Sequence, residues 1–250
     1  MHTTNAVAEP SSAVEQASPQ PIASRKHLAG FLLIGAAIVV LGVLAQRAPA
    51  GGASPGQLGS HGQAIHIYLT AILMDWALLY YCWAGVHRAG GGLGTLSGGR
   101  WTSGKSLAID LAVVLPFWAI WEGAAYGVHW LLGASTAKTV DSLLPQSVLE
   151  IVLWIATSLT AGICEEMAFR GYLQRQLHAV AGGIVMAVLG QGIVFGLFHA
   201  YQGWKNVIVI SVLGVLYGAL AVWRRNLRAN IITHAWADVW NGWLKFVVFR

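Results

Sequence analysis

The sequence predicts an all-α membrane protein, a polytopic bundle of about seven transmembrane helices with a buried polar site in the last four. Hydrophobic residues make up 56% of the 250-residue chain and charged residues only 10%, whereas about a quarter of an ordinary soluble domain is charged. Apolar runs close to the ~20 residues needed to cross a bilayer recur along the chain. The mean hydropathy of +0.60 agrees with a chain that is solvated by lipid.

The chain opens with a polar segment, and the apolar runs follow it. Residues 1–24 bury too little apolar surface to offset the entropy of ordering, so we expect a disordered tail. Arg25 and Lys26 precede a run that is longer than the apolar core of a signal peptide, which favours an uncleaved first span. The predicted spans are about 28–45, 64–86, 106–133, 148–169, 182–200, 206–223 and 229–248.

The positive charge is explained by orientation in a membrane. The net charge is +5, but Lys and Arg are scattered between apolar runs, so no nucleic-acid partner is expected. With the N-terminus in the cytoplasm and the sides alternating, the cytoplasmic side collects ten cations and the other side five, as the positive-inside rule requires. The ten are Arg25, Lys26, Arg88, Arg100, Lys105, Arg170, Arg175, Arg224, Arg225 and Arg228.

Placing an ionisable side chain in hydrocarbon costs free energy, so each such residue in a predicted span indicates a structural or functional role. The last four predicted spans hold the denser group, and its spacing is regular: Glu165, Glu166, Arg170, His199, His234 and Asp238. The earlier spans hold Asp75, Asp110 and Glu122, which belong to no motif that we recognise and are assigned structural roles. Cys82 and Cys164 also fall inside spans, where a buried thiol is expected and a disulfide has no obvious use.

Helical spacing gives the polar residues different roles. Glu166 and Arg170 are four residues apart and can pair on one helix face. Glu165 is turned away from Arg170, so it is the carboxylate without a fixed cation and the better general base. Asp238 lies four residues after His234 and can orient or charge that imidazole.

Three motifs in order resemble those of the CPBP family, the CAAX proteases and bacteriocin-processing enzymes. They are Glu165-Glu166-x-x-x-Arg170, Phe195-x-x-x-His199 and His234-x-x-x-Asp238. The resemblance covers roughly residues 145–245, and the motifs are similar to those of type II CAAX prenyl endopeptidases. It implies that residues 25–144 are N-terminal membrane helices and that residues 145–250 are the catalytic ones. It also implies an integral, multi-pass protein, expected in the plasma membrane of a bacterium.

The resemblance implies an intramembrane endopeptidase that cuts a membrane-associated, prenylated or lipid-linked substrate. Glu165 and His199 match the positions that activate water, and His234 and Asp238 match the pair that stabilises the oxyanion. Many members carry Asn where this chain has Asp238, and an ionised carboxylate cannot donate a hydrogen bond. Asp238 is therefore expected either to hold His234 protonated or to be protonated itself.

Other readings stay open. Two histidines and a carboxylate could bind zinc, but the chain lacks HExxH spacing, so no cofactor and no metal ligands are expected. A non-proteolytic scaffold or bacteriocin-immunity-type protein with the same fold is the alternative function. A transporter ranks last, because no inverted repeat or paired broken spans are seen. The expected partners are the lipid bilayer and a membrane-associated peptide or protein substrate.

Overall fold

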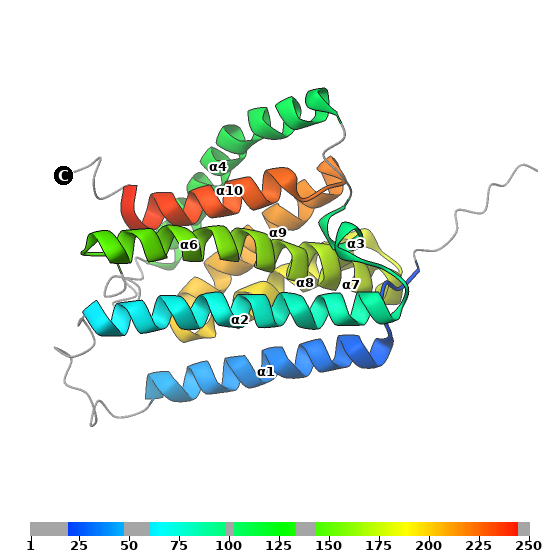
Figure 1. The fold of residues 1–250 in the computed structure, drawn as a ribbon, viewed down its shortest axis with the longest axis horizontal. Helices are drawn as coiled ribbons and strands as arrows, with labels where there is room; N and C mark the ends of the chain where they lie inside the picture. The colour runs from blue at the N-terminus through cyan, green and yellow to red at the C-terminus, as the bar shows by residue number, and fades with distance from the viewer. Residues whose placement is uncertain (1–19, 48–60, 99–102, 134–143, 245–250) are drawn as a thin grey trace, which may run out of the picture.

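The computed structural model describes residues 20–47, 61–98, 103–133 and 144–244, and these residues form helices with no β-strand among them (Figure 1). Most of the predicted tail, residues 1–19, lies outside this part of the chain. Within this described part of the chain, five helical rods are long and apolar enough to cross a membrane. They are α1 (Arg25–Arg47), α2 (His61–Arg88), α4 (Gly104–Leu132), the continuous rod of α6, η1 and α7 (Val148–Ala181), and α9 (Trp204–Arg224). The all-α membrane bundle predicted from the sequence is confirmed.

The helices observed at two of the predicted spans are shorter than the other membrane helices. Helix α8 (Ile184–Phe198) is apolar but has 15 residues, which is about 22 Å against a hydrocarbon core of about 30 Å. Helix α10 (Arg228–Val239) continues into the π-helix η3 (Trp240–Leu244). The structure thus has a helical rod at each of the seven predicted spans, and the fifth and seventh rods fall short of the length or apolar composition of a full span.

The prediction that the fourth span ends near residue 169 is wrong. The rod continues through η1 (Glu166–Leu173) and α7 (Gln174–Ala181) and ends at Gly182, whose φ of 72° closes the helix. This segment was expected to be a polar loop, but it is helical, and its polar side chains have hydrogen-bond partners. Gln176 Nε2 donates to the carbonyl of Ala23 at 2.9 Å, for example. Arg170 is therefore a buried residue and not a loop cation, which leaves nine cations against five in the charge count.

Glycines of α8 allow its backbone to lie in direct contact with the backbone of α9. A Cβ on Gly196 would lie 2.5 Å from the carbonyl oxygen of Val207, and one on Gly192 would lie 2.8 Å from the amide nitrogen of Val215. Small residues allow membrane helices to approach this closely, where dispersion contacts hold them together. The close packing fixes the end of α8, where His199 follows Phe198.

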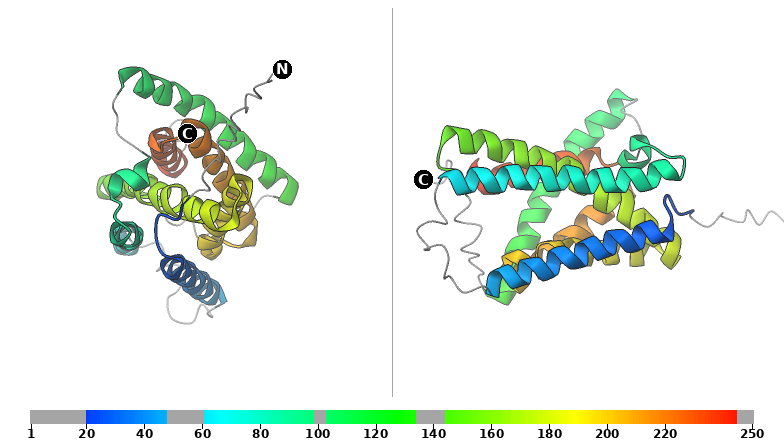
Figure 2. Two further views of the ribbon diagram at one scale, coloured as in Figure 1. Left: turned by 90° about the vertical axis from the view of Figure 1, so that its right-hand side faces the viewer. Right: turned by 60° about the horizontal axis from the view of Figure 1, so that its bottom comes forward.

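Helix α4 is held to the turn between α9 and α10 by a buried carboxylate. Asp110 is fully buried, and its two oxygens lie 2.7 Å from Arg224 Nη2 and 2.6 Å from Arg228 Nε. In Figure 2, α4 lies against α9 and α10 on the opposite side of the bundle from α1. The short helix α3 (Leu93–Ser97) closes the same end, because the amide of Leu227 donates to the carbonyl of Ser97 at 3.2 Å.

The remaining sequence expectations can be placed. Cys82 and Cys164 are both free and buried, as predicted. Glu122 accepts a hydrogen bond from Asn241 Nδ2 at 2.8 Å, which is a structural contact across helices as expected. Arg100 lies outside the described residues.

Candidate active site

The first motif lies where the helix widens. Helix α6 (Val148–Glu165) ends at Glu165, and the π-helix η1 begins at Glu166. The amide of Gln174 bonds to the carbonyl of Phe169, five residues earlier, as a π-turn requires. Such turns are rare and often occur at functional sites. An ordinary α-helix was expected here, and the widened turn differs from that expectation.

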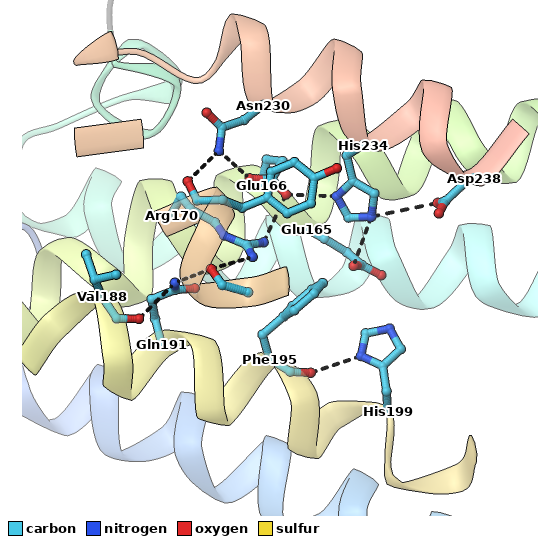
Figure 3. Close-up of polar contacts among 12 residues, drawn as sticks. Glu165, Glu166, Arg170, Val188, Gln191, Phe195, His199, Asn230, His234 and Asp238 are labelled. Atoms are coloured by element: carbon cyan, nitrogen blue, oxygen red, sulfur yellow. Dashed lines mark hydrogen bonds and ion pairs between the residues drawn. The ribbon is translucent and has the colours of Figure 1, made fainter. Parts of the chain in front are cut away.

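Glu166 is the centre of a buried polar network (Figure 3). Its Oε1 accepts from Arg170 Nη1 at 2.9 Å and lies 2.8 Å from Nδ1 of His234, while its Oε2 accepts from Asn230 Nδ2 at 3.1 Å. A carboxylate only accepts, so Nδ1 of His234 carries the hydrogen. The predicted pair of Glu166 and Arg170 is confirmed. Through its contacts with Asn230 and His234, Glu166 also joins η1 to α10.

Arg170 is 2% exposed and is surrounded by groups that accommodate a cation. Besides Glu166, its Nη2 donates to the carbonyl of Gly214 at 3.2 Å. Its guanidinium carbon lies 4.3 Å from the ring centre of Phe195 and 5.1 Å from that of Tyr217. Charge pairing and ring faces together compensate the loss of water around this side chain.

Two further carboxylates face the other nitrogen of His234. Its Nε2 lies 3.8 Å from Glu165 Oε2 and 3.7 Å from Asp238 Oδ2. These distances are those of electrostatic neighbours and exceed hydrogen-bonding range. Oε2 of Glu165 is buried and has no hydrogen-bond partner among the described residues. Glu165 therefore does not pair with Arg170, as its helical position predicted, and its cationic neighbour is the ring of His234 beyond hydrogen-bonding distance.

His199 follows directly after α8, and its ring is held by the backbone of that helix. Nδ1 lies 2.9 Å from the carbonyl oxygen of Phe195, so Nδ1 carries the hydrogen and Nε2 is the acceptor in the neutral ring. Figure 3 shows the imidazole of His199 and the carboxylate of Glu165 pointing toward each other. The structure thus brings all six predicted site residues into one region.

Two polar residues of this region were not among the site residues predicted from the sequence. Asn230 is fully buried, and its Nδ2 also donates to the carbonyl of Tyr217 at 2.8 Å. It lies four residues before His234 on one helix, a spacing that could have revealed it. Asp75, assigned a structural role, lies within electrostatic range of Glu165, His234 and Asp238.

No group of three or more His, Cys, Asp or Glu side chains within the described residues is arranged to hold a metal ion. Whether zinc takes part is tested by chelation below.

Together, the apolar rods and the buried network define an integral membrane protein with a site of carboxylate and imidazole groups. Residues 146–240 match a family model described as Rce1-like, a type II CAAX prenyl endopeptidase. The match confirms the resemblance found in the three motifs and, at the level of the family, supports a CAAX-type intramembrane protease. No curated protein and no solved structure matches the chain.

Proposed function

We propose that the protein is an intramembrane endopeptidase that hydrolyses a peptide bond by water activated between Glu165 and His199. The observation that carries this proposal is the difference between the two adjacent glutamates. Glu166 has three hydrogen-bonding neighbours, whereas Oε2 of Glu165 has no hydrogen-bond partner among the described residues. A general base must be within reach of water and must not be committed to another proton donor.

His199 complements Glu165 in this mechanism. Its Nδ1 is bonded to Phe195, so Nε2 can accept a hydrogen bond from the same water or pass the proton on. Water held between a carboxylate and an imidazole attacks the carbonyl carbon of the scissile bond, and Glu165 takes the proton. The protonated carboxyl then delivers that proton to the leaving amine as the tetrahedral intermediate collapses.

His234 supplies the donor for the developing oxyanion. Glu166 binds its Nδ1–H, and the carboxylates of Glu165 and Asp238 near Nε2 favour a second proton on that nitrogen. An imidazolium is a stronger donor than a neutral ring. This assigns to Asp238 the role of holding His234 protonated, which accounts for a carboxylate where many relatives have an amide.

The substrate is proposed to be a lipid-linked, possibly prenylated peptide. An apolar pocket of about 300 Å³ lies between α6 and α10, the helices that carry Glu165 and His234. Its lining consists of aliphatic side chains and Trp236, among them Leu159 and Ile163. A hydrocarbon chain in this pocket lies next to the site without burying a polar group.

Cleavage of a prenylated peptide and of its unprenylated counterpart by the purified protein in detergent tests the proposal. We expect wild-type cleavage that survives chelation and is lost in Glu165→Gln. Loss on chelation with rescue by zinc would replace the glutamate mechanism by a metal one. Absence of cleavage of every peptide in a broad membrane-peptide panel would favour the non-proteolytic scaffold.

A pocket-filling variant separates the substrate class from the chemistry. Leu159→Trp narrows the apolar pocket and is expected to raise KM for the prenylated peptide without changing cleavage of the unprenylated one. Leu189→Trp, on α8 and 41% exposed, is the matched control that adds the same ring away from this pocket. An equal KM effect for both variants would contradict the lipid-chain assignment.

A further inference from the structure

A second cavity lies at the basic end of the bundle, apart from the catalytic carboxylates. Its volume is about 850 Å³, and it is enclosed by α3, by η1 and α7, and by the turn that joins α9 to α10. Figure 1 shows these segments meeting at one end of the molecule. The positive-inside rule assigns this end to the cytoplasm.

The charge of this cavity has one sign. The cations Arg175 and Arg225 and the imidazole of His178 line it, and within the described part of the chain no Asp or Glu lines it. Two acidic residues contact arginines of this region, and both already have cationic partners: Asp110 pairs with Arg224 and Arg228, and Glu166 pairs with Arg170. Arg225 is exposed, and within the described part of the chain its guanidinium has neither a hydrogen bond nor an ion pair. An anion would therefore find cationic donors here that acidic neighbours do not neutralise.

The inner end of the same cavity reaches Arg170, which is 2% exposed. Nη1 and Nη2 of Arg170 bond to Glu166 and Gly214, but its Nε has no partner among the described residues. A buried donor without a partner is costly, so a ligand or water is expected to reach it. This is a second sign, independent of the surface charge, that the cavity holds a polar acceptor.

The turn that presents Arg225 is held in a fixed conformation. Arg225 has a φ of 55°, in the left-handed region that a side chain rarely occupies. Asn226 supports it, because its Nδ2 donates to the carbonyl of Arg224 at 2.8 Å and its Oδ1 accepts from the amide of Arg228 at 2.9 Å. The guanidinium is thus directed from a rigid backbone, which lowers the entropy lost on binding.

Part of the lining of this cavity is apolar. Ile184, Ala221 and Val222 line it, and Val222 is 41% exposed on the outer surface of α9. A free anion gains nothing from such a lining, whereas a lipid places its phosphate on the cations and its acyl chains along the helices. Basic pockets between helices on the cytoplasmic side suit anionic head groups in this way.

We propose that this cavity binds the head-group phosphate of an anionic phospholipid from the cytoplasmic leaflet. Arg175, Arg225 and His178 bind the phosphate oxygens, and the chains run beside α8 and α9. The proposal does not depend on the proposed proteolysis, since it concerns other residues and a different ligand. Arg170 joins the two regions, because it lines this cavity and also binds Glu166.

Native mass spectrometry in uncharged detergent tests the proposal with dioctanoyl phosphatidylglycerol, dioctanoyl phosphatidylcholine and inorganic phosphate as probes. Phosphatidylglycerol is expected to bind more tightly than the other two. Arg175→Gln with Arg225→Gln should weaken its binding about 30-fold, from about fivefold for each cation beside a head group. Arg225→Gln alone removes no hydrogen bond of the described residues, so this variant should fold normally. It should bind phosphatidylglycerol about fivefold more weakly than wild type.

The matched control removes two cations from the same end of the molecule outside the cavity. Arg88→Gln with Lys105→Gln makes the same change in net charge, and both residues are exposed. Its binding should stay within about twofold of wild type, since neither Arg88 nor Lys105 lines the cavity. Equal loss in the control, or equal binding of phosphatidylcholine, would overturn the proposal. Inorganic phosphate binding as tightly as phosphatidylglycerol would overturn the assignment to a lipid.

Discussion

Glu166→Gln separates stability from catalysis at this site. The substitution keeps the shape of the side chain but removes its charge, and it places one amide oxygen where the carboxylate now meets three donors. These donors are Arg170 at 2.9 Å, His234 at 2.8 Å and Asn230 at 3.1 Å. At least one donor loses its acceptor, and Arg170 stays buried without a counter-charge.

The expected loss of unfolding free energy is about 3 kcal/mol, the lower end of the cost of removing one partner from a buried ion pair. The lower end applies because Arg170 keeps the carbonyl of Gly214 and the two aromatic ring faces. Glu165→Gln is the matched control, one residue away. Because Oε2 of Glu165 has no hydrogen bond to lose among the described residues and lies 3.8 Å from His234, its cost should be about 0.5 kcal/mol.

Unfolding of the purified protein in mixed micelles of SDS and a mild detergent measures both changes. Arg170→Met completes a double-mutant cycle, since removing both charges leaves neither uncompensated. The double variant should be more stable than the sum of the single losses predicts, by about 2 kcal/mol. Additive losses, or equal losses for Glu165→Gln and Glu166→Gln, would refute the distinction between the two glutamates.

Three further predictions follow from the packing around the site. Asn230→Leu should lower the free energy of unfolding by about 2 kcal/mol in the same titration, because Glu166 Oε2 loses a buried donor; no loss would exclude Asn230 from the network. Gly196→Ala should lower the free energy of unfolding by about 1 to 3 kcal/mol, because the added methyl group forces α8 away from α9. Gly123→Ala is the control and should not lower it, since no atom lies within 4 Å of the new Cβ. Equal effects of the two substitutions would contradict the close packing of α8 and α9. His199→Gln should lower kcat of peptide cleavage by about 10² or more with an unchanged melting temperature, and a rate within a few-fold of wild type would remove His199 from the mechanism.

The helices could be predicted from the sequence because lipid imposes length and composition on each span. The predicted starts of α2 and α4 differ from the observed ones by three residues or fewer, and the start of α6 coincides. The pair of Glu166 and Arg170 was also predictable, because it depends only on the rise and turn of one helix. The free carboxylate of Glu165 followed from the same geometry.

Features that depend on a neighbouring helix were not predictable. The rod beyond residue 169 looked like a polar loop, but Gln174 and Gln176 find acceptors on α9 and near the N-terminus of α1. Asn230 belongs to the site because α10 places it beside Glu166 of η1, a contact that depends on how the two helices pack. The π-helix of Glu166–Leu173 has no local sequence signal, because i,i+5 bonding is set by the contacts that the widened turn permits.

The central claim is that Glu165 activates water while Glu166 holds the site together. Its most direct test is the single-turnover rate of peptide cleavage by folded Glu165→Gln, measured beside its melting temperature. If Glu165 is the base, the rate should be about 10² to 10⁴ times lower than wild type, with a melting temperature lowered by about 2 °C or less. A rate within threefold of wild type would contradict it.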